Sequence, residues 1–421
     1  MIYLKKLKFY ISQRPLFQKL LNPFQTYFLS FYRSLFPITN LPNDFWKIGI
    51  DDLKCFFAMT FTTVSLWIAT AQTGNPNSVI AYWDGPNYIY AAITLYDISH
   101  SNPWTKYFNY PPSYFACHLP GYPLLIRFFA FFTIGNFYIA SYITILFTGY
   151  LLCYSFRRLL IVYDCVSNPT YTTMLLSIIP MRLFIYHSII ASEPLYLSCV
   201  YMCFIFYKIE NFPLMMIFIW YACITRIEGM LIGATIGFCY LLRFEIVKAL
   251  SMFSTFLSTI GLLILHRAMF GDAMAYIKFN SGHQGLVGKK LFVELIYGRS
   301  STHDVLYLHS FIDFYFPYVI GICVVVIVAG PLGIFGAAYL LYVALLRHID
   351  LFRYSLPSAV FAILIGYDKL WSDKISKSMI YFFAPIYFAF LLSYSTGQIH
   401  SNRSSDKFLM EVINANLDKL H

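Results

Sequence analysis

Apolar runs recur along this chain from Cys55 to Leu392, and they constrain its fold more than any other feature. The first run, residues 55–71, is long enough to cross a bilayer, because a span needs roughly 17–25 predominantly apolar residues. Of the 421 residues, 59% are hydrophobic and only 12% are charged, whereas about 25% of the residues in soluble domains are charged. The sequence therefore predicts an all-α, polytopic membrane protein, and this composition excludes a disordered chain.

Basic residues outnumber acidic ones in the sequence. The chain has 30 Lys and Arg against 20 Asp and Glu, a formal net charge of +10. In a polytopic protein this excess is typical of cytoplasmic loops, so we expect no nucleic acid as a partner. The nine cysteines are scattered without a CxxC pair, and we interpret them as apolar core residues rather than as a disulfide framework or a metal site.

We expect three regions along the chain. Residues 1–54 form a basic and aromatic leader on the cytoplasmic side, without the pattern of a removable signal peptide. Residues 55–395 form the transmembrane domain, with about 9–11 helices, and residues 396–421 form a polar C-terminal tail. No internal repeat and no boundary of a second soluble domain is visible.

Two long loops are predicted, residues 72–120 and residues 269–312. The first carries a single Lys and is expected on the non-cytoplasmic side, with a short interfacial helix over 91–98. Residues 121–134 suit a re-entrant or interfacial piece better than a full span, and Gly330-Pro331 is expected to divide the apolar stretch 314–346. The other predicted spans are about 172–190, 194–207, 212–225, 229–242, 249–266, 355–366 and 378–395.

Each acid near a membrane edge is a candidate functional residue, because an unpaired ion in hydrocarbon is costly. Asp84 lies between Trp83 and Gly85-Pro86, where a partly desolvated carboxylate would suit general-base work. An Asp-Gly turn beside an interfacial Trp explains the same residues equally well. With Arg157-Arg158 on the cytoplasmic side, the predicted spans place five charged candidates at the outer surface: Asp84, Glu193, Arg226, Glu228 and Asp272.

Two further clusters stand at the starts of apolar segments. His118 precedes Pro120-Gly121-Tyr122-Pro123 and could donate to a phosphate, although a turn with a surface His is the simpler interpretation. Ser192-Glu193-Pro194 is typical of a helix cap. Arg182 and His187 nevertheless add polar groups to the same hairpin.

Two more clusters carry charged or polar residues. Arg226 and Glu228 could form an ion pair. Alternatively, the guanidinium of Arg226 could bind the oxygens of a phosphate. Asp272 is typical of a helix N-cap, and His283 and Gln284 could hydrogen-bond a sugar. No Walker A loop, HExxH helix, GxSxG elbow or GxGxxG fingerprint is present, so nucleotide hydrolysis and zinc proteolysis have no support.

Taken in order, these clusters resemble the GT-C superfamily of polytopic glycosyltransferases. Within it, the chain is most similar to the family of the GPI-anchor second mannosyltransferase and its prokaryotic relatives. The family often has Phe-Pro-Leu-Tyr-Pro where this chain has Leu119-Pro120-Gly121-Tyr122-Pro123. The Arg-Tyr that the family usually has before its last helix is matched only loosely by residues 377–381. The matching segments are Trp83-Asp84-Gly85, Leu119-Pro120-Gly121-Tyr122-Pro123, Ser192-Glu193, Thr225-Arg226-Ile227-Glu228-Gly229 and Gly271-Asp272-Ala273-Met274-Ala275-Tyr276.

The resemblance implies transfer of mannose or another hexose from a polyprenyl- or dolichyl-phosphate donor to a hydroxyl group. The acceptor would be a lipid, a glycan or a protein, and the transfer would invert the anomeric centre on the non-cytoplasmic face. Asp84 would be the general base, and Arg226 and His118 would hold the donor phosphate. The other substrate-binding candidates are Trp83, Tyr122, Glu193, Glu228, Asp272, His283 and Gln284.

The resemblance implies no required cofactor, and no metal ligands are assigned, although a divalent metal is compatible with the reaction. We expect a bacterial cytoplasmic membrane, with the endoplasmic reticulum as the alternative. The rival function is a lipid or solute transporter, or flippase, without transferase chemistry. Intramembrane charges would then line a translocation route, and inverted repeats, which are typical of that class, are not visible here.

Overall fold

The computed structural model describes residues 26–38, 41–282, 315–346 and 350–414, and these residues fold into helices without a β-strand. Four helical stretches are long and apolar enough to cross a membrane. The prediction of an all-α, multi-pass membrane protein is confirmed at this level, whereas the count of 9–11 spans stays a prediction. The four stretches are α3 (Ile50–Thr73), α8 (Phe137–Tyr163), α14 to α15 (Ile246–Phe270) and α24 (Lys374–Ser401).

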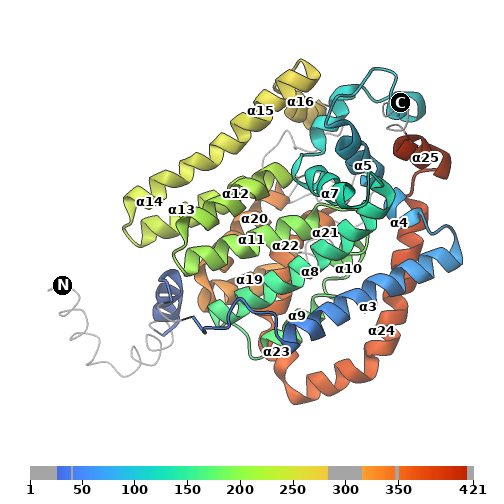
Figure 1. The fold of residues 1–421 in the computed structure, drawn as a ribbon. Helices are drawn as coiled ribbons and strands as arrows, with labels where there is room; N and C mark the ends of the chain where they lie inside the picture. The colour runs from blue at the N-terminus through green and yellow to red at the C-terminus, as the bar shows by residue number, and fades with distance from the viewer. Residues whose placement is uncertain (1–25, 39–40, 283–314, 347–349, 415–421) are drawn as a thin grey trace, which may run out of the picture.

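Shorter helices fill the space between these four (Figure 1). Every residue of α11 (Glu193–Lys208) is buried, so this helix forms the centre of the bundle. It packs against α8 and α12 (Phe212–Thr225). The remaining apolar helices are α7 (Gly121–Phe132), α13 (Met230–Leu242), α19 (Phe316–Val328), α20 (Gly330–Ala344) and α22 (Leu356–Val360) with its continuation η5 (Phe361–Gly366).

Several predicted boundaries agree with these helices. The spans 194–207, 212–225 and 229–242 correspond to α11, α12 and α13. The chain also breaks between α19 and α20 at Gly330-Pro331, as predicted.

Two predicted helices are wrong. Residues 172–190 do not form one helix, because α9 (Pro169–Leu175) ends before Pro180 and α10 (Met181–Tyr186) begins after it. Proline lacks the N–H that a continuous helix needs. The interfacial helix predicted at 91–98 lies earlier, as α5 (Gly85–Thr94).

The first long loop is a packed cap of short helices rather than an open connection. It contains α4 (Ser78–Ala81), α5, α6 (Pro103–Phe108) and the 3₁₀ helix η1 (Pro112–Cys117). Residues 396–414 of the predicted polar tail are largely helical, because α24 extends to Ser401 and α25 (Asp406–Asn414) follows. In α25 the side chains of Phe408, Leu409 and Val412 are buried, and this helix contacts α5 and α6.

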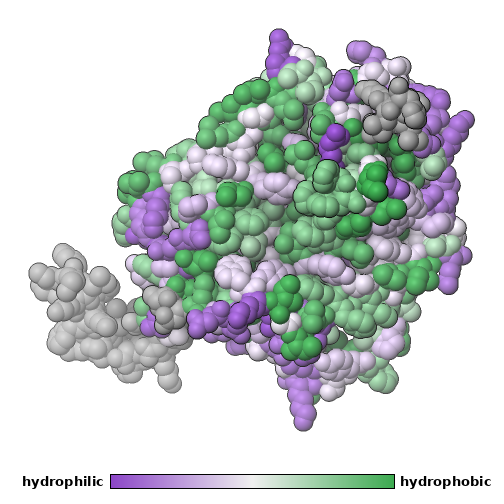
Figure 2. Space-filling view, in the orientation of Figure 1, coloured by the Kyte–Doolittle hydropathy of each residue, from purple (hydrophilic) through white to green (hydrophobic). Residues whose placement is uncertain are grey.

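The outer surface of the bundle is strongly apolar. Figure 2 shows hydrophobic residues over much of one face, with hydrophilic residues gathered toward its periphery. Phe57, Phe131 and Phe382 are each 73% exposed or more. Soluble monomers rarely expose contiguous apolar patches of this kind, so the surface agrees with a protein that contacts lipid.

The helices place two different sets of residues at opposite ends of the bundle. At what we call the basic end, Arg157 and Arg158 pair with Asp52 at 3.0 and 2.8 Å, and Lys208 and Arg243 lie near the same end. At what we call the loop end, α3 reaches residues 74–120, and Tyr138 at the start of α8 donates a hydrogen bond to Asn77. The long helices therefore separate a basic surface from the packed loop.

Candidate active site

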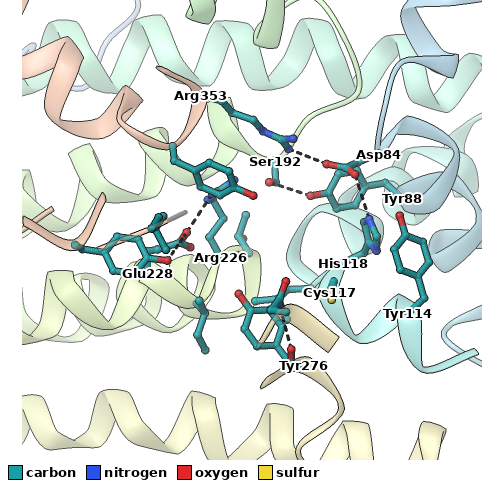
Figure 3. Close-up of a pocket in the computed structure, with 17 residues that line it drawn as sticks. Asp84, Tyr88, Tyr114, Cys117, His118, Ser192, Arg226, Glu228, Tyr276 and Arg353 are labelled. Carbon is teal, nitrogen blue, oxygen red and sulfur yellow. Dashed lines mark hydrogen bonds and ion pairs between the residues drawn. The ribbon is translucent and has the colours of Figure 1, made fainter. Parts of the chain in front are cut away.

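Four charged residues meet at the loop end, although they come from distant parts of the chain. Figure 3 shows three of them, Asp84, Arg226 and Arg353. Asp84 directly precedes α5, and Glu193 is the first residue of α11. Arg226 lies between α12 and the 3₁₀ turn η2 (Ile227–Gly229), and Arg353 lies in the short helix α21 (Leu351–Tyr354). Each charge stands at a helix boundary, where the backbone leaves the apolar interior.

Arg353 joins two carboxylates. Its Nη2 lies 2.8 Å from Oδ2 of Asp84, and its Nε lies 2.6 Å from Oε1 of Glu193. Arg226 donates from Nη1 to the same Glu193 oxygen at 2.8 Å and from Nη2 to Glu228 at 3.2 Å. The five side chains thus form one ion-paired network of three acids and two guanidinium groups.

Burial differs within this network. The side chain of Glu193 is 4% exposed and that of Arg226 is 10% exposed, whereas that of Asp84 is 26% exposed. Removing ions from water is costly, and pairing offsets that cost. Asp84 is therefore the most accessible carboxylate of the network.

The charge state of Asp84 is set by its neighbours. Burial by itself would raise the pKa of this carboxyl group, but the positive charge of Arg353 and the contact with His118 outweigh burial and hold the pKa well below its usual value. Asp84 is consequently ionised at neutral pH. Its side chain does not cap α5; its Oδ2 contacts Arg353 and its Oδ1 faces His118.

Hydrogen bonds tie the loop to this network. His118 Nε2 lies 3.4 Å from Oδ1 of Asp84 and 2.9 Å from Nδ2 of Asn87. The hydroxyl of Tyr88 donates to Ser192 Oγ at 3.1 Å. Ser192 stands at the N-cap position of α11 and Glu193 lies in its first turn, as predicted, but the Ser192 side chain makes no capping hydrogen bond.

A cavity of about 210 Å³ opens beside the network. Its walls combine charged groups with tyrosine rings, and Tyr342 donates a hydrogen bond to Glu228 at 3.2 Å. Aromatic rings beside charged groups suit a small polar ligand. The lining residues are Asp84, Tyr88, Tyr114, Cys117, His118, Leu119, Ser192, Thr225, Arg226, Ile227, Glu228, Tyr276, Asn280, Tyr342, Leu346, Arg353 and Tyr354.

Half of the predicted site residues line this cavity or contact its charged groups. Asp84, His118, Arg226 and Glu228 line it, and Glu193 contacts both arginines from behind. The predicted Arg226–Glu228 ion pair is present.

The other predicted residues lie elsewhere. Trp83 is 47% exposed and does not line the cavity. Tyr122 is buried outside the cavity lining, and the centroid of its ring lies 5.2 Å from that of the Tyr88 ring. Asp272 pairs with Lys278 at 2.7 Å outside the cavity and accepts from the Met274 backbone, as expected for a residue that precedes a helix. His283 and Gln284 lie outside the described residues.

Arg353 is the main residue that the sequence analysis missed. Arg353 lies between two apolar segments of the sequence, as Arg226 does. The same signal, a charged residue between apolar segments, could therefore have identified both arginines. The pair Arg353-Tyr354 lines the cavity, whereas Lys377 and Tyr381, which were loosely matched to the Arg-Tyr of the family, line a second cavity that also reaches Asp51 at the basic end.

Comparisons with known proteins add no family to this description. A scan against models of protein families finds no match, and a search of curated proteins finds none with significant similarity. Within the part of the chain that the structure describes, no cluster of three or more His, Cys, Asp or Glu could hold a metal ion. Fold and site together define an all-α membrane protein with an ion-paired polar cavity at one end of its helices.

Proposed function

We propose that this protein is a membrane glycosyltransferase of the GT-C type. It would move mannose or another hexose from a polyprenyl- or dolichyl-phosphate donor to a hydroxyl group, with inversion, on the non-cytoplasmic face. The observation that carries the proposal is the meeting of Asp84 with Arg226 and Arg353 in one small cavity. A carboxylate can accept the proton of the acceptor, and guanidinium groups suit a phosphate.

The two arginines are the proposed phosphate ligands. A planar guanidinium binds two phosphate oxygens at once, and Arg353 already uses its Nε and Nη2 for two separate carboxylates. A donor phosphate would compete with Asp84 for Arg353. Because Arg353 keeps the pKa of Asp84 low, a shift of this guanidinium toward the phosphate makes Asp84 the stronger base that catalysis needs.

The proposed reaction is a single displacement. The acceptor oxygen attacks the anomeric carbon, and its proton passes to a carboxylate oxygen of Asp84. The bond from the anomeric carbon to the phosphate oxygen breaks, and its electron pair stays on the leaving phosphate. Arg226 and Arg353 would stabilise that developing charge.

The cavity volume supports a head group rather than a whole lipid as the enclosed ligand. Its 210 Å³ is below the roughly 300–1,000 Å³ that encloses drug-sized molecules. The polyprenyl chain would then lie outside the cavity, against the apolar surface of the bundle. This division suits a lipid-linked sugar.

The sidedness follows from the distribution of basic residues. Residues 1–54, which lead into α3, contain eight Lys and Arg, whereas residues 72–120 contain a single Lys. Cytoplasmic segments collect Lys and Arg, so the basic end would be cytoplasmic and the loop end non-cytoplasmic. A bacterial cytoplasmic membrane is the preferred location, and the endoplasmic reticulum is the alternative.

The test is to incubate the purified protein with a panel of polyprenyl-phosphate sugars and to follow transfer or hydrolysis. Asp84→Asn should bind donor yet transfer it at least about a hundredfold more slowly, as expected for a lost general base. Asp164→Asn is the matched control, because Asp164 is an exposed acid next to the basic end with φ of 46°, which Asn also tolerates.

Two outcomes would contradict the proposal. One is a wild-type protein that neither binds nor turns over any donor of the panel. The other is wild-type turnover by the Asp84→Asn variant. Movement of an intact lipid or solute across a vesicle membrane, without cleavage of the donor, would instead support the transporter.

A further inference from the structure

A second, larger cavity of about 580 Å³ lies between α3, α9 and the first half of α24. Charged groups line one part of it, with Asp51 and Lys54 from α3 and Lys377 from α24. Phe61 and Phe388 line another part and stack with ring centroids 5.6 Å apart. The cavity therefore changes from charged to apolar along the helices.

The lining comes from one face of each helix. On α24 it includes Lys377, Ile380, Ala384 and Phe388, a spacing of three or four residues that keeps side chains on one side of a helix. Pro385 lies inside α24, and Figure 1 shows this helix bending beside α3. A proline bends a helix because it lacks the N–H and its ring meets the preceding turn.

The charged part of this cavity, which we call its mouth, is formed by Asp51, Lys54 and Lys377, and it has more cations than acids. Asp51 is paired with Lys54 at 2.8 Å and with Arg157 at 3.3 Å. Lys377 lies over the ring of Tyr171, 5.2 Å from its centroid, and it makes no ion pair with the acids that the structure describes. The mouth is thus net basic and can take an anion.

The dimensions fit one leaflet of a bilayer. From Lys377 to Phe388 the helix advances 11 positions, or about 16 Å at roughly 1.5 Å per residue. Half of a hydrocarbon core of about 30 Å is about 15 Å. A headgroup at Lys377 therefore leaves room for an acyl chain that reaches Phe388.

We propose that this cavity binds an anionic phospholipid, with its phosphate at Lys54 and Lys377 and one acyl chain between α3 and α24. Only 6% of the most apolar 18-residue window of α24 is fully buried inside the protein, so much of this helix outside the cavity face is open to lipid. The basic end is assigned to the cytoplasmic leaflet, where anionic lipids attract basic groups. The site is independent of the glycosyltransferase proposal, because it lies at the other end of the bundle.

The first experiment measures lipid retention by native mass spectrometry. The full-length protein is purified in detergent and exposed to equal amounts of phosphatidylglycerol and phosphatidylcholine with the same acyl chains. We expect one phosphatidylglycerol to be retained in preference to phosphatidylcholine. Lys54→Ala and Lys377→Ala should each weaken this retention by about fivefold, whereas Lys369→Ala, an exposed lysine outside the cavity, should not change it.

The second experiment blocks the apolar part without changing charge. Ala384→Trp fills the cavity and should abolish retention of phosphatidylglycerol. Ala389→Trp, at an exposed position of the same helix outside the lining, is the matched control and should retain the lipid. Equal retention of both lipids by the wild-type protein, or unchanged retention in both lysine variants, would overturn the proposal and leave the transferase assay unaffected.

Discussion

At the scale of single residues, Arg353 is the side chain on which the candidate site depends. It is separated from Asp84 by 269 positions and from Glu193 by 160, yet it binds both. Without it, Glu193 would keep Arg226 as its ion-pair partner and Asp84 would keep only the contact with His118. Its role is therefore to hold the first loop against the start of α11.

We predict that Arg353→Ala lowers the free energy of unfolding by about 3 kcal/mol, the lower end of the range for breaking a buried ion pair. The lower end applies because Glu193 keeps Arg226 as a partner and Asp84 is partly exposed. Thermal unfolding of the purified protein would measure the loss. Adding Asp84→Asn to Arg353→Ala should recover part of it, since one unpaired charge is removed.

Arg267→Ala provides the comparison for that measurement. Arg267 is exposed at the end of α15, and its guanidinium donates to the carbonyl of Gly271 and forms no ion pair with the acids that the structure describes. Its replacement should leave the unfolding temperature close to that of the wild type. An Arg353→Ala protein as stable as this control would show that the network contributes nothing to folding.

At the scale of elements, close backbone contact positions the helices around the cavity. A Cβ atom at Gly121, the first residue of α7, would lie 2.2 Å from Thr225 Oγ1 and 2.9 Å from its Cα. Thr225 is the last residue of α12 and directly precedes Arg226. Only glycine allows α7 to approach the arginine this closely.

Gly121→Ala should therefore separate α7 from α12 and reduce both thermal stability and donor binding. Gly261→Ala is the informative counterpart, because a Cβ there meets nothing within 4 Å. That change should stabilise α15 by about 0.5–1 kcal/mol. Melting curves of the two variants should thus shift in opposite directions, and a shift in the same direction would refute the close-contact explanation.

The C-terminal helix is a second element with a specific task. Phe408 of α25 packs on Trp104 with ring centroids 4.7 Å apart, and Glu411 accepts hydrogen bonds from Lys106 and Tyr107. The segment before α25 pairs with the backbone beside Asp84, since Trp83 N–H donates to Asn402 at 3.1 Å. The tail therefore fastens the loop that carries the candidate base.

Phe408→Ala should loosen this attachment, because truncation of a buried Phe costs about 3–5 kcal/mol. We expect faster hydrogen exchange in residues 103–108 and 402–414, with little change in α8 or α11. Met410→Ala tests specificity, since Met410 lies on the same helix and is 44% exposed. Unchanged exchange in the Phe408 variant would mean that α25 does not hold the loop.

At the scale of the whole molecule, the two ends of the bundle should face opposite compartments. A cysteine introduced at position 272, where the Asp272 side chain is 37% exposed, should react with an impermeant maleimide from the non-cytoplasmic side. A cysteine at exposed position 369 should react only after permeabilisation, because this position lies next to the basic end. The neighbouring Asp368 accepts a hydrogen bond from Ser167, which follows the end of α8. Both labellings would be compared in a background without Cys323, which is exposed. Labelling of both positions from one side would contradict the proposed orientation.

Local sequence determined the class of this protein and many of its helices. Hydrophobicity acts residue by residue, so the runs that became α11, α12 and α13 could be predicted, as could the break at Gly330-Pro331. Local composition failed where burial was decided by distant contacts. Residues 396–421 were predicted only as a polar tail, yet the amphipathic helix α25 within them packs on a loop about 300 positions away in the chain.

The candidate site was determined partly by the sequence and partly by the tertiary structure. The scarcity of charges in an apolar chain was enough to single out Asp84, Glu193, Arg226 and Glu228 from the sequence. Only the tertiary structure decided that they share one cavity, that Arg353 completes the network, and that Trp83 and Asp272 stay outside its lining. The physical reason is that an ion pair depends on a separation of a few ångströms through space, about which spacing along the chain carries no information.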